Sequence, residues 1–346
     1  MRALARAAAT ASQLTASAGF RDRGRVPHRF HRGCGCVANE LDEWEGALGE
    51  RKHLLKVGTP KKDVVAMGSH QSQSQSVASV KMHQVMARLR AHHETSCVNG
   101  TDSQPPLAVR RASVLVPLVL PTSAVAMDSF VNQMDSINPR PSKFSLANRK
   151  RKAHPDSPCV LLCTRAPGMS SHAGEVCLPG GRNDPAESDE DAALREAEEE
   201  IGLSKKNVTV LTLLPQSLST GNVSVRPVVG FVTNSSFVPT LNPAEVHDTF
   251  VVPLEIFLKQ QGYSFRDTEF TSAGKTNSIR VHYFQWEDKK IWGLTAAVLI
   301  QTAELAFGAT APFPKKPPGP GGMDITDIAG ELGFTELKLV KPSSRL

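Results

Sequence analysis

Aromatic residues are absent from a long stretch of this chain of 346 residues, since none occurs between positions 45 and 129. Inside that stretch, residues 69–76 read SHQSQSQS, a polar low-complexity run that buries no apolar surface. Most aromatic residues lie between 130 and 313, among short apolar runs separated by Gly, Pro and Asn, as a packed domain requires. The sequence therefore predicts three regions: a low-order leader over 1–126, one folded domain over 127–311, and a Pro- and Gly-rich tail over 312–346.

Paired cysteines and long apolar runs are also lacking. The six cysteines form no CxxC pair and have no zinc-like spacing with the histidines, so neither a metal knuckle nor a disulfide framework is indicated. A reducing compartment is expected. The most apolar stretch outside the predicted domain, residues 113–125, is short and broken by Pro117 and Pro121. No membrane span is predicted.

Acidic residues are scarce at the amino end, where the first 39 residues hold seven Arg against one acid, Asp22. The formal charge of +6 therefore comes largely from the flanks, and no nucleic-acid partner is expected. The basic run at 149–152 is either an anion-binding patch or a solvated turn before a strand, and the turn is the commoner meaning of such a run.

Both ends resemble targeting signals. Residues 1–21 are rich in Ala, Ser and Thr, contain Arg and lack acids, which is the composition of a mitochondrial or plastid transit peptide and also of an unselected leader. The last three residues, Ser344, Arg345 and Leu346, are a conservative variant of the SKL tripeptide that a peroxisomal import receptor reads. We predict a peroxisomal location, with a mitochondrion or plastid as the alternative. A form starting at Met127 would lose only the leader and is expected to fold.

A helix with clear end signals is predicted over 189–200. Ser188, followed three residues later by Asp191, resembles a capping box. Gly202 suits the left-handed position that ends a helix. Asp191 and the later Glu198 are expected to be ordinary exposed acids of this helix.

Three glutamates of the predicted helix, Glu196, Glu199 and Glu200, fall within one arc of about 100° at roughly 100° per residue. The opposite side is apolar and consists of Leu194, Ala197 and Ile201. Crowded like charges repel one another unless a cation offsets them. Because carboxylate oxygens are hard ligands, this face predicts a site for Mg²⁺ or Mn²⁺ rather than zinc.

The helix belongs to a longer pattern: Gly181, five residues, Glu187, seven residues, and then REAEEEIGL over 195–203. The pattern fills every defined position of the Nudix signature, and the chain resembles the Nudix hydrolases over about 142–308. That resemblance implies an α/β fold, an α/β/α sandwich around a mixed sheet, preceded here by the long low-order leader. It also implies hydrolysis of a diphosphate linked to a nucleoside.

The resemblance further implies roles for individual residues. The metal ligands would be Glu199, Glu200, Glu196 and the backbone near Gly180. Glu196 would be a ligand or the general base for the attacking water, and Glu187 and Arg195 would be orienting groups.

We call the pattern over 181–203 the Nudix box. The segment that leads into this box, LLCTRAPGMSSHAGEVCLPGG over 161–181, resembles the extra signature of the coenzyme A pyrophosphatase branch. Two positions depart from the branch pattern, since Ser170 stands in place of Arg and Leu178 in place of Phe. The missing arginine would remove a charge-assisted contact to phosphate, whereas Leu for Phe conserves apolar character. The candidate substrate-binding residues are Arg165, Gly181, Arg182 and Glu245.

Other elements fit this fold. Strands are predicted near 160–163, 208–214, 225–232 and 281–286, and a second helix over 295–307. Glu245, in the fragment NPAEV, would contact metal or water, or would be an exposed acid after a Pro turn. Trp292, in IWGLT, would stack on adenine or, more simply, belong to the core.

Three functions remain open from the sequence. The first is hydrolysis of coenzyme A or acyl-coenzyme A to 3′,5′-ADP and (acyl-)4′-phosphopantetheine. The second is hydrolysis of another nucleoside diphosphate derivative, such as NADH or ADP-ribose, and the third is nucleotide sensing without catalysis. The preference between free and acylated coenzyme A and the oligomeric state are not predicted.

Overall fold

The computed structural model describes residues 68–99, 109–120, 157–219, 223–272 and 275–326, together with residues 328, 338 and 339. The chain divides into two compact units, Met1–Asp63 and Val64–Leu346, and all described residues belong to the second. No helix in this described part is long and apolar enough to cross a membrane. The predictions for residues 1–21, 149–152 and 344–346 lie outside the described residues.

The first sheet is mixed and has eight strands: β1 (Arg110–Val119), β2 (Cys159–Arg165), β3 (Val176–Cys177), β4 (Gly180–Arg182), β5 (Val208–Leu213), β6 (Ser217–Ser219), β7 (Val223–Val232) and β8 (Val246–Pro253). Strands β1 and β7 are parallel neighbours, whereas β2 and β4 pair with β1 in antiparallel fashion. Both faces of β7 are covered, so it reads as a nearly continuous apolar run. The predicted strands near 160–163, 208–214 and 225–232 are confirmed.

A second sheet of five strands follows in the chain: β9 (Tyr263–Ser272), β10 (Lys275–Trp286), β11 (Lys289–Trp292), β12 (Gly322–Met323) and β13 (Lys338–Leu339). Strands β9, β10 and β11 form an antiparallel meander, and the predicted strand near 281–286 is the end of β10. Strand β12 pairs with β10 in parallel.

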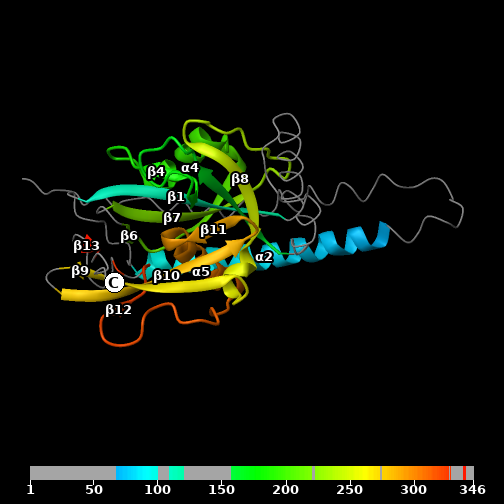
Figure 1. The fold of residues 1–346 in the computed structure, drawn as a ribbon. Coiled ribbons are helices and arrows are strands. Elements are labelled where there is room, and N and C mark those ends of the chain that lie inside the picture. Colours follow the sequence, from blue (N-terminus) through cyan, green and yellow to red (C-terminus); the bar gives the residue numbers. More distant parts are fainter. Residues whose placement is uncertain are drawn as a thin grey trace, which may run out of the picture. The chain divides into compact units, whose positions relative to one another are not determined.

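Helices cover both faces of the first sheet, which confirms the α/β/α sandwich (Figure 1). Helix α4 (Asp189–Ile201) packs on one face against β1 and β7. Helix α5 (Gly293–Phe307) lies on the other face, where it also contacts α2 (Gly68–Asn99), β10 and the short 3-10 helix η4 (Leu254–Leu258). A second 3-10 helix, η3 (Lys205–Asn207), links α4 to β5.

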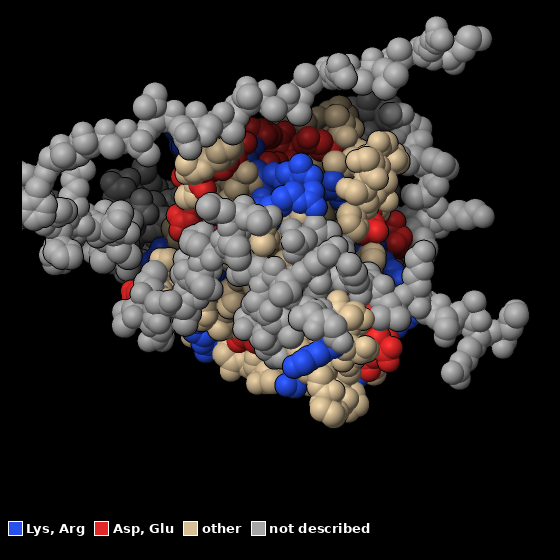
Figure 2. All heavy atoms as spheres, turned by 90° about the vertical axis from the view of Figure 1, so that its left-hand side faces the viewer, with Lys and Arg blue, Asp and Glu red and all other residues tan. Residues whose placement is uncertain are grey.

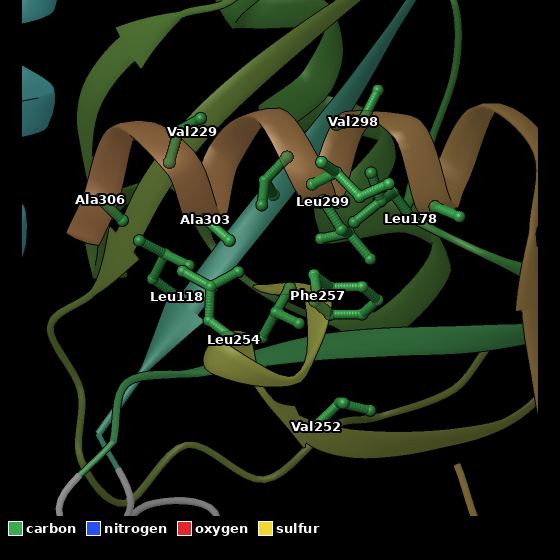
Figure 3. Close-up of a cluster of buried hydrophobic side chains, with 14 of the residues drawn as sticks. Leu118, Leu178, Val229, Val252, Leu254, Phe257, Val298, Leu299, Ala303 and Ala306 are labelled. Carbon is green, nitrogen blue, oxygen red and sulfur yellow. The ribbon is translucent and has the colours of Figure 1, made fainter. Parts of the chain in front are cut away.

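The larger hydrophobic core lies on the α5 side of this sheet (Figure 3). Strand residues Leu118 and Val229 face the helix residues Leu299 and Ala303 there, and Phe257 of η4 fills the space between them. Helix α5 is apolar on most sides because the first sheet, η4, α2 and β10 all pack against it.

The predicted low-order leader over 1–126 is wrong for two elements, because α2 and β1 lie within it and contribute to the core. Their side chains that are no more than 2% exposed include Met82, Val85, Leu89 and Leu118. Their burial shows that this part of the core is aliphatic, so the lack of aromatic residues did not mean the lack of a core. The folded domain therefore begins before residue 127.

The predicted tail over 312–346 is also wrong in part. The ring of Phe313 stacks on Tyr263, with 3.8 Å between ring centroids, and Met323 of β12 is buried beside Phe270 and Ile279. Although this segment is rich in Pro and Gly, its few apolar side chains anchor it to the second sheet.

Candidate active site

Helix α4 begins and ends where its sequence signals predict. The Ser188 side chain accepts a hydrogen bond from the Asp191 N–H at 3.0 Å, and Gly202 adopts a φ of 70° while its N–H bonds the last turn. The predicted exposure of Asp191 and Glu198 is confirmed. Because both ends are capped, the limits of the helix are well defined.

The two sides of α4 differ as predicted. Leu194, Ala197 and Ile201 face the sheet and are buried. The acidic face crosses from the surface into the interior, since Glu199 is exposed, Glu196 is half-buried and Glu200 is only 4% exposed. The carboxylate of Glu200 is therefore held at the junction between the helix and the sheet.

Arg195 connects the acidic groups of the box. Its Nε donates to Glu187 Oε1 at 2.9 Å, and its Nη1 donates to Glu196 Oε1 at 3.0 Å and to Glu199 Oε2 at 3.3 Å. The hydrogen bond from Arg195 lowers the pKa of Glu187. The guanidinium also bonds the carbonyl of Arg182 at 2.9 Å, which ties α4 to β4. These contacts are compatible with the orienting roles expected for Arg195 and Glu187, which stay a prediction.

The glycine pair before the box brings the backbone close to two of these carboxylates. The Gly180 N–H donates to Glu200 Oε2 at 3.0 Å, and Gly180 has a φ of 153°. A Cβ at Gly180 would collide with the carbonyl oxygen of Ser113, and one at Gly181 would collide with the Glu196 carboxylate. Gly180 therefore needs glycine, because a Cβ there would meet backbone, whereas a side chain at position 181 would displace the Glu196 carboxylate.

The electrostatics of the site disfavour the ionised glutamates. Burial, together with the charges of Glu196 and Glu245, raises the pKa of Glu200 to about 7, although the hydrogen bond from Gly180 opposes the shift. Burial also raises the pKa of Glu196. Glu245 therefore belongs to the same cluster of acids, even though it lies far along the chain. A bound cation would relieve the repulsion within this cluster.

The donor set fits a hard divalent cation. It consists of carboxylate oxygens on adjacent turns of α4, with a backbone segment at Gly180 beside them. Over the residues that the structure describes, no three His, Cys, Asp or Glu side chains already converge at ligand distance. The assignment of Glu196, Glu199, Glu200 and Gly180 as ligands therefore stays a prediction.

The other predicted substrate residues surround this cluster. Arg165 ends β2, and its buried Nε has no hydrogen-bond partner among the described residues. The side chain of Arg182 is exposed. Glu245 is half-buried, and its carboxylate accepts a hydrogen bond from Asn242 at 3.3 Å, so it is not a freely exposed acid. Figure 2 shows acidic and basic side chains gathered next to each other on one face of the molecule.

Trp292 does not belong to the core, which corrects the simpler of the two expectations. It is half-buried, stacks on Tyr283 with an interplanar angle of 8°, and lines a cavity of about 650 Å³. Gly180 and Arg165 line the same cavity. The acidic site therefore adjoins a space large enough for a small molecule.

One polar network at the site was not predicted. Asp189, the first residue of α4, is buried and accepts hydrogen bonds from Arg111 at 2.5 Å, Asn183 at 2.9 Å and Arg226 at 3.3 Å. These partners come from β1, from the segment after β4 and from β7. No local signal reveals the network, because its members are brought together only by the sheet.

Comparisons with known proteins identify the family. The NUDIX domain model matches residues 144–272. The chain is 34% identical over 187 residues to the uncharacterized Nudix hydrolase NudL of Photorhabdus laumondii, a match that covers 52% of this chain and 97% of that protein. The chain belongs to the Nudix family.

Two further relatives differ in location and length. Nudix hydrolase 15, mitochondrial, of Arabidopsis thaliana is 39% identical over 154 residues, which cover 43% of this chain and 53% of that protein. The peroxisomal coenzyme A diphosphatase NUDT7 of Mus musculus is 34% identical over 161 residues, which cover 44% of this chain and 66% of that protein. The chain thus spans about half the length of the Arabidopsis relative.

Proposed function

We propose that this chain is a divalent-metal-dependent pyrophosphatase that cleaves a diphosphate linked to a nucleoside. The observation that carries the proposal is the acidic face of α4, where Arg195 joins Glu196 to Glu199 and Glu200 is bonded to the Gly180 N–H, at the edge of a cavity that Gly180 lines. Membership of the Nudix family supports the same reaction.

In this reaction water attacks a phosphorus atom and the bridging oxygen leaves. Glu199 and Glu200 would hold the cation, which offsets the charge that builds on the phosphate oxygens. Glu196 would be a further ligand or would accept the proton of the attacking water. Arg195 would hold Glu196 and Glu199 in place through one guanidinium nitrogen.

We further propose coenzyme A or acyl-coenzyme A as the substrate, with 3′,5′-ADP and (acyl-)4′-phosphopantetheine as products. The 161–181 segment and the similarity to the mouse coenzyme A diphosphatase support this choice. Arg165 suits a phosphate contact, because its buried Nε lacks a partner within the described part of the chain and its side chain reaches the cavity. Arg182, Gly181 and Glu245 are the other proposed substrate contacts.

A second candidate is hydrolysis of NADH or ADP-ribose. Ser170, which stands where the branch pattern has Arg, is exposed and provides no positive charge for an additional phosphate. A nucleotide sensor without catalysis is disfavoured, since such a module would not need the complete set of glutamates.

One assay separates these functions. The purified chain is incubated with Mg²⁺ and coenzyme A, dodecanoyl-coenzyme A, NADH or ADP-ribose, and the products are resolved by mass spectrometry. We expect 3′,5′-ADP from the two coenzyme A compounds. Cleavage of NADH or ADP-ribose alone would favour the second candidate, and binding without any product would favour the sensor.

The cellular location is a separate proposal. The relatives include mitochondrial and peroxisomal proteins, and we propose the peroxisome on the basis of Ser344, Arg345 and Leu346. A fluorescent protein fused to the amino terminus should give a punctate peroxisomal pattern, and deletion of these three residues should disperse it. Diffuse fluorescence of the fusion with Leu346 intact would contradict the proposal.

A further inference from the structure

The cavity of about 650 Å³ beside Gly180 extends between the two sheets, on the α5 side of the first sheet. Strands β1 and β7 line it from the first sheet, and β9 and β10 line it from the second. Most of its side chains are apolar, among them Leu178, Leu218, Phe270 and Val298. Its volume and apolar lining are those of a small-molecule site.

The cavity is long in one direction. Tyr283, Val281 and Ile279 line it at alternate positions of β10, so it follows this strand for about 13 Å, at about 3.3 Å per residue. Tyr283 stacks on Trp292 at one end. Ile279 lies at the other end, where it packs with Leu218 and Phe270 in a separate apolar cluster.

Polar groups line the cavity at more than one point, since Arg266 and Thr268 come from β9 and Ser219 from β6. Another set lies on the side of the β2–β3 hairpin. Arg165 and Glu175 come from the β2–β3 hairpin, which also contributes the lining residue Val176. The Val176 carbonyl accepts a hydrogen bond from Thr295 in the first turn of α5, and Trp292 directly precedes this helix. A diphosphate near Gly180 and Arg165 would thus place the apolar part of its ligand toward Ile279.

We propose that the cavity binds the acyl chain of an acyl-coenzyme A, and that Thr268 of β9 is a residue that determines the accepted chain length. This inference rests on the proposed function and selects acyl-coenzyme A over free coenzyme A as the preferred substrate. Thr268 is half-buried, lines the cavity and lies opposite Ile279 in the strand register. An extended acyl chain suits this elongated, mostly apolar space, whereas the charged adenosine phosphate does not.

Leu178 supports the assignment from the opposite wall. It is buried, faces α5 beside Val298 and lines the cavity (Figure 3). The coenzyme A branch pattern has the larger Phe at this position, so Leu leaves additional space next to Gly180. Each methylene of a chain buried there would tighten binding by up to about fourfold.

The test compares two Thr→Phe variants on one strand. In Thr268→Phe the ring would fill the Ile279 end of the cavity, whereas Thr271→Phe lies on the other face of β9 and is the matched control. We measure kcat/KM for coenzyme A, hexanoyl-coenzyme A and dodecanoyl-coenzyme A below their micelle concentrations. Ala112→Leu, on the β1 wall, is a second variant that narrows the same cavity, and thermal melting checks that each variant is folded.

We expect the wild type to prefer dodecanoyl-coenzyme A over coenzyme A by about tenfold or more. Thr268→Phe and Ala112→Leu should remove most of this preference while leaving kcat/KM for coenzyme A within about twofold, and Thr271→Phe should resemble the wild type. Equal kcat/KM for both substrates in the wild type, or an equal loss on both in folded Thr268→Phe, would overturn the inference.

Calorimetric titration in EDTA, without turnover, separates the two proposals. If no coenzyme A compound is cleaved, the proposed function fails. The cavity assignment then stands if dodecanoyl-coenzyme A binds the wild type more tightly than coenzyme A does and Thr268→Phe removes that difference. It falls if the two ligands bind equally well.

Discussion

The two faces of the eight-stranded sheet are built in different ways. On one face, α4 carries most of the charge of the site, and ion pairs and hydrogen bonds hold its Glu196, Glu200 and Asp189 in place. On the other face, α5 has a single charged residue, Glu304, and packs through aliphatic contacts next to the cavity. The fold thus places the proposed reacting groups and the apolar cavity on different faces of the sheet. Substitutions of the α4 glutamates should change activity, whereas removal of buried aliphatic side chains on the α5 face should change stability.

Strand β1 is shared by both faces, so its removal is expected to have the largest effect. A chain beginning at Met127 lacks β1 and α2, and it loses four buried side chains of β1: Leu115, Val116, Leu118 and Val119. Each contributes about 1.5–3 kcal/mol, and their sum is comparable to the 5–15 kcal/mol stability of a typical domain.

We expect the Met127 form to show no cooperative melting by circular dichroism and no hydrolysis. A chain beginning at Val64 retains both elements and is the control, which should melt as the full chain does. A soluble Met127 form with the melting temperature of the full chain would contradict this account of β1.

The next largest effect concerns the acidic face alone. Glu200→Gln keeps the shape of the side chain but removes a carboxylate that would bind the cation, so kcat should fall by about 10²–10⁴-fold. The neighbouring exposed residue provides the control, since Glu198→Gln should change kcat by less than about twofold. Circular dichroism should show an intact fold in both variants. Equal rates in the two variants at limiting Mg²⁺ would refute the role of Glu200.

A smaller effect is expected for Asp189, which joins α4 to strands of the first sheet. Asp189→Ala removes the carboxylate that pairs with Arg111 of β1 and Arg226 of β7. Because breaking a buried ion pair leaves its partners uncompensated, the free energy of unfolding should fall by about 3–5 kcal/mol. Urea denaturation at neutral pH measures the loss, and Asp189→Asn, which retains one acceptor, should lose less. A loss below about 1 kcal/mol for Asp189→Ala would show that the network does not anchor α4.

The smallest effect concerns substrate affinity. Ser170 is exposed, and Ser170→Arg would restore the arginine of the coenzyme A branch pattern. A new charge-assisted hydrogen bond of about 1–3 kcal/mol should lower the KM for coenzyme A, with kcat nearly unchanged. Ser170→Gln, which adds length without charge, is the control. An unchanged or higher KM in Ser170→Arg would mean that the phosphate is held elsewhere, with Arg165 and Arg182 as the next candidates.

These regions also differ in how far they could be predicted. Helix α4 was predicted almost to the residue, because Ser188, Gly202 and the spacing of its apolar positions are local signals. Strand β1 was not predicted, since its central place depends on pairing with β7, which lies more than a hundred residues later in the chain. Pro117 within the strand and the lack of aromatic residues around it also argued against a strand here.

The candidate site could also be predicted only where its residues form a local sequence pattern. The glutamates of the box could be predicted from a motif, whereas the partners of Asp189 and the cavity beside Trp292 depend on the packing of distant strands. Glu245 comes close to the predicted helix because the Asn242 N–H donates to the Glu200 carbonyl at 2.9 Å and the Asn242 side chain donates to Glu245, contacts that no local pattern reveals. The glutamates could therefore be predicted from the sequence, but the residues that line the cavity could not.

The central claim is that the acidic face of α4 binds a divalent cation. The most direct test is the electron paramagnetic resonance signal of free Mn²⁺ during titration with the purified chain. We expect the wild type and Glu198→Gln to reduce the free Mn²⁺ signal to the same extent, and the double variant Glu199→Gln/Glu200→Gln to leave most of it unchanged. Equal Mn²⁺ binding by the wild type and the folded double variant would contradict the account.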